Sequence, residues 1–286
     1  MSSISAVLRQ GESRSSVSST AAEIKKCGKA KQWSAVLKLL RDAPQSNFLC
    51  SIAIGACGQC KQWQQALSLL SGMRESKMEQ DTISHSAGAS ACEKGGQWQR
   101  ALLLLSESRE AGLEPTVISY NICISACRSG GLWQQALSFL GELREAKLEP
   151  TAISYNAGIS ACQSSGQWQR ALRLLRNLRE VKLEADVISY SAGVSACGSG
   201  EHWQQALSLF SELREVKLQP TTTCYNIGIS ACERSGQWHT SLSLLRELRE
   251  VKLQPTIVSY GAAINACEKC EQWQQALSSR VARRVD

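Results

Sequence analysis

The sequence predicts an all-α fold, a solenoid of stacked antiparallel helix pairs. Three observations predict it. A tryptophan recurs eight times in the 286 residues, and after a first gap of 30 residues every spacing is 35. A cysteine stands six residues before each tryptophan. Within each period the apolar residues fall at helical spacing, and self-similarity of this kind is typical of stacked supersecondary units.

The stretch 152–186 shows how one period makes two helices, and we number positions 1 to 35 from Ala152. Its first half, AISYNAGISAC, places Tyr155, Ile159 and Cys162 on one helix face. Gly166 then predicts a turn. A proline ends most units, since it cannot donate to a continuing helix. The second half carries a further apolar stripe, expected to be buried, of Trp168, Ala171, Leu172, Leu175 and Leu178.

The repeat phase sets the domain boundaries. About eight repeats fill a domain at 17–286, with the first and last incomplete, and they start near residues 17, 47, 82, 117, 152, 187, 222 and 257. Residues 1–20 hold eight serines and two arginines against one acidic residue. That composition is typical of a transit peptide, although 1–16 could equally be a disordered tail.

Charge and cysteine usage exclude several classes of protein. The net charge is +7, but residues 42–279 hold 21 basic and 22 acidic side chains, so the repeats are not a polybasic rod. No apolar run reaches the ~18 residues that a membrane helix needs. Eight of the thirteen cysteines share one repeat position, which favours packing over metal or disulfide chemistry. We expect no metal and no cofactor.

Catalysis is not expected either. The three histidines, His85, His202 and His239, occupy different repeat positions. The zinc deaminase pairing of H-x-E with P-C-x-x-C is missing from the sequence. The sequence therefore predicts a protein that is not an enzyme.

A second stripe on the first helix has a different character. Positions 2, 5, 9 and 12 share a face that is separate from the apolar face at 4, 8 and 11. Position 5 is Ser or Asn in six successive repeats, between Ala21 and Gly261 at the two ends. Such short hydrogen-bonding side chains can approach a ligand without filling the space in front of them.

A 35-residue helix pair with Tyr at position 4, Ala-Leu at 20–21 and Pro at 34 resembles the pentatricopeptide repeat family, most closely its tryptophan-rich algal members. The resemblance implies a right-handed superhelix that binds single-stranded RNA, with one base read by each repeat. It also implies an organellar protein, of the chloroplast or, as the alternative, of the mitochondrion. Carried over to this sequence, the base-reading pairs at positions 5 and 35 are Ser51 with Asp81, Ser86 with Thr116, Asn121 with Thr151, Asn156 with Asp186, Ser191 with Thr221, and Asn226 with Thr256.

Two further groups of residues belong to the expected interface, and the resemblance implies the role of the first. Position 2 would sandwich each base, and it is occupied by Phe48, Ile83, Ile118, Ile153, Ile188, Thr223 and Val258. We expect position 13, beside the base stripe, to contact phosphates through Lys94, Arg234 and Lys269. The family's rules read the six pairs as 5′-G-purine-pyrimidine-U-purine-pyrimidine-3′. Thr at position 35 departs from the usual pattern, so the U at Asn156 is the clearest base.

Two alternatives remain open from the residues alone. Thr or Asp just before a helix is a good N-cap, stabilising by ~1 kcal/mol, and needs no RNA to explain it. The near-neutral repeats also suit a protein-interaction solenoid that binds a peptide or partner on its concave face. The main expectation is a monomer that binds single-stranded RNA, with a protein effector as a further partner and no membrane.

Overall fold

The computed structural model describes residues 17–42, 46–76, 78, 80–198 and 202–271, and every regular element within them is a helix. The first helices of the repeats are residues 17–29, α3 (Asn47–Gln59), α5 (Thr82–Lys94), α7 (Val117–Gly130), α9 (Ala152–Ser164), α11 (Val187–Gly198), α13 (Thr222–Arg234) and α15 (Ile257–Lys269). The second helices are α2 (Trp33–Asp42), α4 (Trp63–Glu75), α6 (Trp98–Glu110), α8 (Trp133–Glu145), α10 (Trp168–Glu180), α12 (Trp203–Glu215) and α14 (Trp238–Glu250). The predicted all-α architecture of helix pairs is confirmed. The second helix expected in the last repeat falls in 272–286, outside the described residues.

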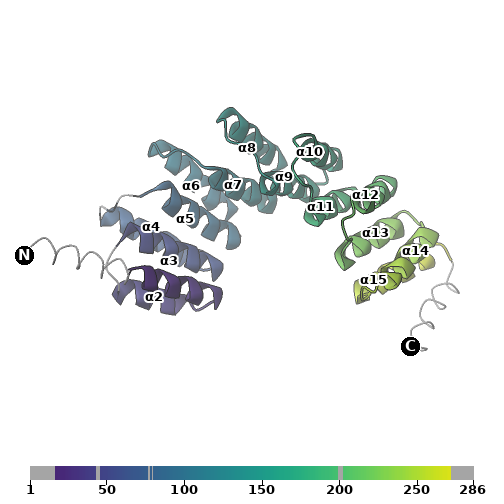
Figure 1. Cartoon of the computed structure of the whole chain (residues 1–286), viewed down its shortest axis with the longest axis horizontal. Helices are drawn as coiled ribbons and strands as arrows, with labels where there is room; N and C mark the ends of the chain where they lie inside the picture. The colour runs from purple at the N-terminus through teal and green to yellow at the C-terminus, as the bar shows by residue number, and fades with distance from the viewer. Residues whose placement is uncertain (1–16, 43–45, 77, 79, 199–201, 272–286) are drawn as a thin grey trace, which may run out of the picture. The chain divides into compact units, whose positions relative to one another are not determined.

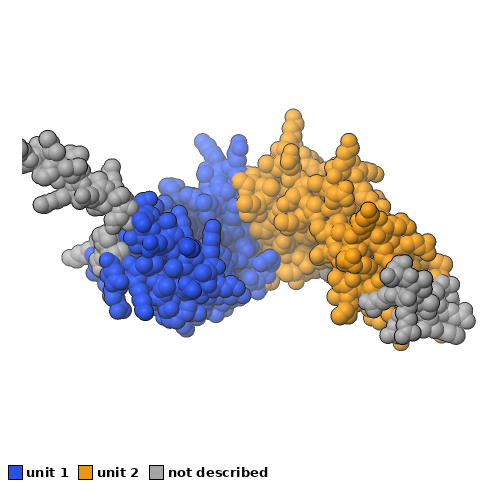
Figure 2. Space-filling view, turned by 60° about the horizontal axis from the view of Figure 1, so that its bottom comes forward, with its two compact units in different colours: residues 1–130, 141–149 blue, residues 131–140, 150–286 orange. Residues whose placement is uncertain are grey.

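The chain forms two compact units, and each is described by itself. Unit 1 comprises residues 1–130 and 141–149, and unit 2 comprises 131–140 and 150–286, coloured blue and orange in Figure 2. In unit 1, α5 packs against α3, α4, α6 and α7. In unit 2, the first helices α9, α11, α13 and α15 pack in succession, each of the first three beside its own second helix (Figure 1). Small residues at positions 7 and 10, such as Gly158 and Ala161, let these first helices approach closely.

The first helices bury the apolar stripe that the sequence indicates. Tyr155 is 1% exposed, and Ile159 and Cys162 are fully buried. The cysteines at this position are buried in every described repeat except the first, where Cys27 is half-buried. Burial raises the pKa of six of these thiols to about 11, those of Cys57, Cys92, Cys127, Cys162, Cys197 and Cys232. Neutral, buried thiols act as small apolar residues, so their predicted packing role is confirmed.

The tryptophans correct one expectation. Trp168 and Leu172 are half-buried rather than buried, and Leu174 takes a place in the core that the repeat pattern did not indicate. Two tryptophans of unit 1, Trp63 and Trp98, each lie over a glycine of the next repeat. A Cβ added to Gly95 would stand 2.5 Å from Trp63, and one added to Gly130 would stand 2.8 Å from Trp98. These tryptophans therefore pack against the next repeat at the edge of the core.

Long side chains connect the second helices of successive repeats. An arginine at position 28 pairs with a glutamate at position 26 of the following repeat. The pairs are Arg74 with Glu107, Arg109 with Glu142, Arg179 with Glu212, and Arg214 with Glu247. Each arginine is at least 40% exposed, so each pair contributes no more than about 1 kcal/mol. These arginine–glutamate pairs therefore connect neighbouring second helices but add little to the free energy of unfolding.

The link between one repeat and the next uses a left-handed backbone residue that is usually lysine. Lys182 has φ of 56° and Lys217 has φ of 59°, whereas Gly112 fills the same position with φ of 71°. A residue with a Cβ is destabilised by about 1 kcal/mol or more in this conformation, and glycine is not.

We therefore expect Lys182→Gly to stabilise unit 2 by about 0.5–1 kcal/mol, because relief of the strain exceeds the greater flexibility of glycine in the unfolded chain. The midpoint of urea unfolding, followed by tryptophan fluorescence, measures this. The reverse substitution, Gly112→Lys, should lower the midpoint. Equal midpoints for wild type and both variants would contradict the assignment of strain to this residue.

Candidate nucleic-acid interface

Within each unit, the residues at position 2 form a row of exposed, mostly apolar side chains. Ile83 and Ile153 are each 68% exposed, and Ile188 is 65% exposed, although the residue two positions after each of them is buried. Phe48, Ile118 and Val258 are also exposed, and Thr223 is exposed as the polar member. No core contact explains a large aliphatic residue that faces solvent in repeat after repeat. Exposed apolar residues in a regular row indicate an interaction surface.

Beside this row, the structure brings together one predicted base-reading pair with a third residue. The Asn156 Nδ2 donates to the Asp186 Oδ1 at 3.3 Å. The Ser189 hydroxyl, from position 3 of the next repeat, lies 2.6 Å from the Asn156 Oδ1 and 2.8 Å from the Asp186 Oδ1. Since this hydroxyl has one hydrogen, it donates to either oxygen in turn. The three side chains hold the amide and the carboxylate in a fixed relation at the surface.

The same arrangement recurs two repeats later with a hydroxyl in place of the carboxylate. The Asn226 Nδ2 lies 3.1 Å from the Thr256 Oγ1, and the Ser259 hydroxyl donates to the Asn226 Oδ1 at 2.5 Å. Both Asn pairs that lie within unit 2 are therefore in contact. Asn121 belongs to unit 1 and Thr151 to unit 2, so this pair falls across the division between the units.

Repeats with serine at position 5 differ. Ser86 bonds Ser119 at 2.9 Å, and Ser191 lies 2.9 Å from the Cys224 thiol, so both contact position 3 of the next repeat instead of position 35. Ser51 turns back to the carbonyl of Asn47 in its own helix, at 2.9 Å. A hydroxyl is too short to span both partners. The structure therefore does not bring together Ser51 with Asp81, Ser86 with Thr116, or Ser191 with Thr221.

The residue at position 35 is also a helix N-cap. The side chains of Asp81, Thr221 and Thr256 each accept from the backbone N–H three residues later. Asp186 does the same for Ser189, at 2.8 Å. The N-cap interpretation is thus confirmed, and it coexists with the contact to Asn156. One side chain serves both as the cap of its own helix and as the neighbour of position 5.

The Asp186 carboxylate is held ionised. Burial by itself raises the pKa of this carboxyl group, but hydrogen bonds from Ser189, Asn156 and the Ile188 N–H outweigh burial and bring the pKa below its ordinary value. A lowered pKa stabilises the fold above the unfolded-state pKa, and this contribution disappears as the pH falls through the folded-state value. At neutral pH the group is a negatively charged acceptor.

The position 3 serines were missed by sequence reasoning. They recur as Ser84, Ser119, Ser154, Ser189 and Ser259, and the hydroxyl oxygens of several accept a hydrogen bond from the N-cap backbone N–H in a capping box. The recurrence of a hydroxyl three residues after each cap is a signal of that box. Its second contact, to position 5 of the preceding repeat, spans 33 residues and leaves no local trace in the sequence.

The basic residues at position 13 differ from one another. Lys94 and Arg234 lie at the ends of α5 and α13, and Lys94 is exposed. Lys269 lies 3.3 Å from the Glu233 carboxylate of the preceding repeat, so part of its charge is compensated. At position 12, Glu93 accepts from Ser125 at 2.7 Å and Gln163 donates to Ser195 at 3.1 Å, which forms a second polar ladder between first helices.

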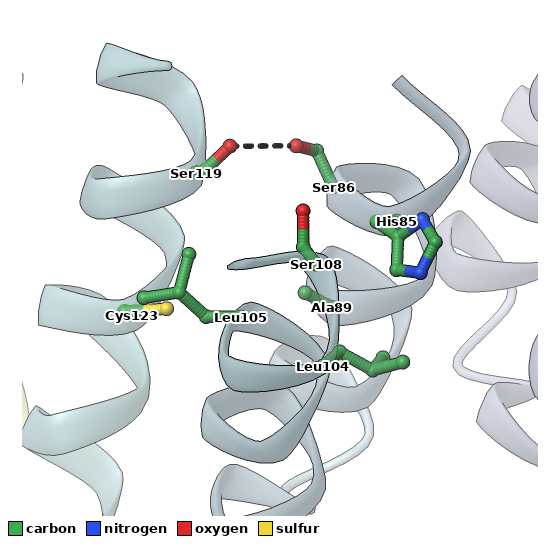
Figure 3. Close-up of a pocket in the computed structure, with 8 residues that line it drawn as sticks. All are labelled: His85, Ser86, Ala89, Leu104, Leu105, Ser108, Ser119 and Cys123. Atoms are coloured by element: carbon green, nitrogen blue, oxygen red, sulfur yellow. Dashed lines mark hydrogen bonds between the residues drawn. The ribbon is translucent and has the colours of Figure 1, made fainter. Parts of the chain in front are cut away.

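A small pocket lies beneath the interface in unit 1 (Figure 3). Its lining includes His85, Ser108 and Cys123, and the Ser86–Ser119 hydrogen bond spans its edge. His85 stands at position 4, where the later repeats have Tyr, and its Nδ1 lies 3.3 Å from the Asp81 carbonyl oxygen. The cavity volume is about 10 Å³, which is room for a single water molecule. It is a packing gap and not a substrate pocket.

Metal sites and membrane-spanning helices are both missing from the part of the chain that the structure describes. Within it, no group of three His, Cys, Asp or Glu side chains is placed to hold a metal ion. None of its helices has the length and apolar character needed to cross a bilayer.

Comparison with known families gives repeated matches. The model described as the pentatricopeptide repeat domain matches residues 68–131, 103–165, 140–200, 173–235 and 229–269. The model described as the PPR repeat matches residues 48–78. The comparison with curated proteins gives no match.

Solved structures of this family share the fold. The pentatricopeptide repeat protein PPR10 from maize is 22% identical, with a TM-score of 0.67 over 91% of this chain and 38% of that one. PPR10 in complex with an 18-nt psaJ RNA element is 18% identical, with a TM-score of 0.78 over 90% of this chain and again 38% of that one. The PPR domain of Arabidopsis thaliana protein-only RNase P 1, in complex with tRNA, is 15% identical, with a TM-score of 0.54 over 65% of this chain and 95% of that domain.

The chain spans less than two fifths of the length of PPR10. Because these identities are low, the structures establish the fold alone. The family models, in contrast, cover most of the sequence and follow its 35-residue period. The chain therefore belongs to the pentatricopeptide repeat family.

Proposed function

We propose that the chain binds single-stranded RNA with sequence selectivity, along the exposed face of its first helices and with one nucleotide for each repeat. The observation that carries the proposal is the exposed aliphatic residue of position 2 beside a fixed amide–carboxylate pair, as in Ile153 with Asn156 and Asp186. The fold shared with PPR10, whose structure holds an 18-nt RNA, supports it.

The chemistry of unit 2 suits a base between two repeats. Ile153 and Ile188 offer exposed apolar surfaces against which the two faces of a base can pack. One amide hydrogen of Asn156 is used by Asp186, which leaves the other for a carbonyl oxygen of uracil. The ionised Asp186 can accept from the uracil N3–H. Apolar contact thus supplies affinity, and the polar pair supplies discrimination.

Filter binding to a random single-stranded RNA pool, at several salt concentrations, tests the proposal. We expect binding at low salt that weakens as salt rises, since phosphate contacts release counterions. A pool of double-stranded RNA is the matched control, because paired bases cannot enter between repeats. Absence of binding to single-stranded RNA at low salt would exclude this function.

The phosphate contacts carry a separate prediction. Neutralising Lys94 and Arg234 together, by substitution with Gln, should weaken binding to every RNA sequence alike. The slope of log affinity against log salt should fall by roughly 0.7 for each phosphate that is no longer neutralised. Lys217→Gln, in an exposed link between repeats, is the control and should leave the slope unchanged. If the double variant keeps the wild-type slope, these two residues are solvated charges without a phosphate partner.

We also propose that the protein is imported into an organelle, the chloroplast first, and acts there as a monomer. The serine-rich composition of residues 1–16 supports import, and these residues lie outside the described part. A fluorescent protein fused to residues 1–20 should accumulate in plastids, and mitochondrial fluorescence would favour the alternative. Light scattering should give the mass of one 31.2 kDa chain.

A further inference from the structure

One second helix, α10, has a composition unlike that of the others. It carries four arginines, Arg170, Arg173, Arg176 and Arg179, against the single acidic residue Glu180. Its net charge is +3, whereas α4, α6 and α14 are neutral and α8 and α12 each carry −1. At the positions of Arg173 and Arg176, α12 has Ser208 and Ser211. The repeat period therefore does not account for this charge.

The four arginines cross the outer face of α10 as an oblique stripe. Steps of three residues turn the side chain by about 300°, so each arginine is offset by about 60° from the one before. At one end, the Arg170 guanidinium lies 4.4 Å over the ring of Trp133 in the preceding repeat. At the other end, Arg179 pairs with Glu212 of the following repeat. Neighbouring repeats therefore occupy both ends of the stripe.

The middle of the stripe is open. Arg173 and Arg176 are exposed, and the described residues supply neither with a hydrogen-bond or ion-pair partner. At the position where most other second helices have Glu, α10 has the neutral Asn177. Two neighbouring guanidinium groups without a counter-charge repel each other and favour an anion from outside.

A groove lies beside these arginines, between α10 and α12. Its volume is about 250 Å³, and Leu172, Leu175 and Leu209 form its apolar part. Arg176, Gln205 and Ser208 supply hydrogen-bond donors at its margin, where Glu212 is engaged with Arg179. The groove exists because the second helices α10 and α12 are linked by long side chains, while α9 and α11 pack directly. It can take one apolar side chain together with polar neighbours.

The charge around the stripe selects the class of ligand. The basic surface is confined to α10, because α12 carries net −1 and has Glu215 exposed beyond Glu212. A nucleic-acid strand carries a phosphate on every nucleotide. If it continued past α10, its phosphates would lie beside the carboxylates of α12 and be repelled by them. A short peptide has its charges at separate side chains and can place apolar residues between them. The local charge therefore fits a peptide better than RNA.

We propose that the outer face of α10 binds a short acidic segment of a partner protein. Two carboxylates of the segment pair with Arg173 and Arg176, and a neighbouring apolar side chain enters the groove at Leu172 and Leu209. Planar guanidinium groups bind carboxylates through two parallel hydrogen bonds, which explains arginine at both places. This surface is separate from the exposed face of the first helices, so the segment and RNA bind at the same time.

The test uses fluorescence anisotropy with the full chain. The probe is the labelled peptide Gly-Asp-Glu-Leu-Asp-Glu-Leu-Gly, and its amide counterpart Gly-Asn-Gln-Leu-Asn-Gln-Leu-Gly is the chemical control. The double variant Arg173→Ser/Arg176→Ser takes the residues that α12 already has at these positions, so the helix should still form. Arg246→Ser removes the exposed arginine at the corresponding position of α14, which is a neutral helix.

The wild-type chain and the Arg246→Ser variant should bind the acidic peptide equally. The double variant should bind it at least about tenfold more weakly, as expected when two charge-assisted hydrogen-bonding groups are removed. The amide peptide should not distinguish wild type from the double variant. Affinity for RNA should be the same in all three proteins.

Three outcomes overturn the proposal: wild type does not bind the acidic peptide, the double variant binds it as well as wild type does, or the double variant is impaired in RNA binding instead. Circular dichroism of the double variant confirms that it is folded before the comparison.

Discussion

With Asp186 kept in place, Asn156→Thr is expected to change the preferred nucleotide at one position of the bound RNA from U towards G. In the wild-type protein the Asn156 amide donates to the Asp186 Oδ1, at 3.3 Å. Threonine has no amide group, so the Asp186 carboxylate receives one hydrogen bond fewer and can accept from the N1–H and N2–H of guanine, while the Ser189 N–H still donates to it. The wrong base should cost roughly 1–3 kcal/mol, if these contacts resemble other bidentate readouts of a base edge.

Selection from a random RNA pool, with and without the substitution, measures this change. Asn226→Thr is the matched control, because Asn226 contacts Thr256 and no carboxylate. The control should alter the position two nucleotides away and leave U at the position of Asn156. If the selected sequences from the Asn156→Thr variant still have U there, the side chain is a solvated helix residue and reads no base.

Two isoleucines of the same helix should separate stability from RNA binding. Ile159 is fully buried in α9, whereas Ile153, near the start of that helix, is 68% exposed. We expect Ile159→Ala to lower the free energy of unfolding by about 2–5 kcal/mol, because apolar burial is reduced and a cavity remains. Ile153→Ala should leave the free energy of unfolding within about 0.5 kcal/mol of wild type. It should nevertheless weaken RNA binding, because the base is deprived of one of its apolar faces.

Hydrogen exchange shows where the effect of Ile159→Ala falls. Stability in a repeat protein is close to a sum over neighbouring units, so faster exchange should be concentrated in α9, α10 and α11. Urea unfolding and anisotropy with labelled RNA complete the comparison of the two variants. Uniform loss of protection throughout the described helices would contradict local coupling. An unchanged RNA affinity for Ile153→Ala would contradict a role of position 2 at the interface.

The helix pairs and most of the core could be predicted because both repeat every 35 residues. Periodicity identified the buried face that carries Tyr155, Ile159 and Cys162, and all three are buried. It did not predict that Trp168 is only half-buried. Periodicity indicates which way a side chain points, but it does not indicate the size of the residue that the side chain faces. For Trp63 and Trp98 the facing residue is a glycine of the next repeat, which leaves room for the indole ring.

The site could be predicted in part for a similar reason. The sequence indicated Asn156 and Asp186 as a pair, and they are in contact. Nothing in it indicated that Ser189 joins them, since this serine belongs to the next repeat and its local role is in a capping box. The repeat pattern also made Ser86 equivalent to Asn156, although the shorter side chain bonds Ser119 instead. The length of the side chain at position 5 determines whether it reaches position 35 or only position 3 of the next repeat. A pattern of polar and apolar positions does not contain that information.

The shared serine bears on how a chain of this kind can lengthen or shorten in evolution. Asn156 depends on Ser189, and Asn226 depends on Ser259 in the same way, so the equivalent residues are interchangeable between repeats. Unequal crossing-over that duplicates or deletes a window of one repeat length keeps position 5 of one repeat facing position 3 of the next at the new junction. A window of any other length separates the cap from its partner and shifts the buried face. Recombination between near-identical repeats can therefore alter the number and order of units, while each junction remains structurally intact.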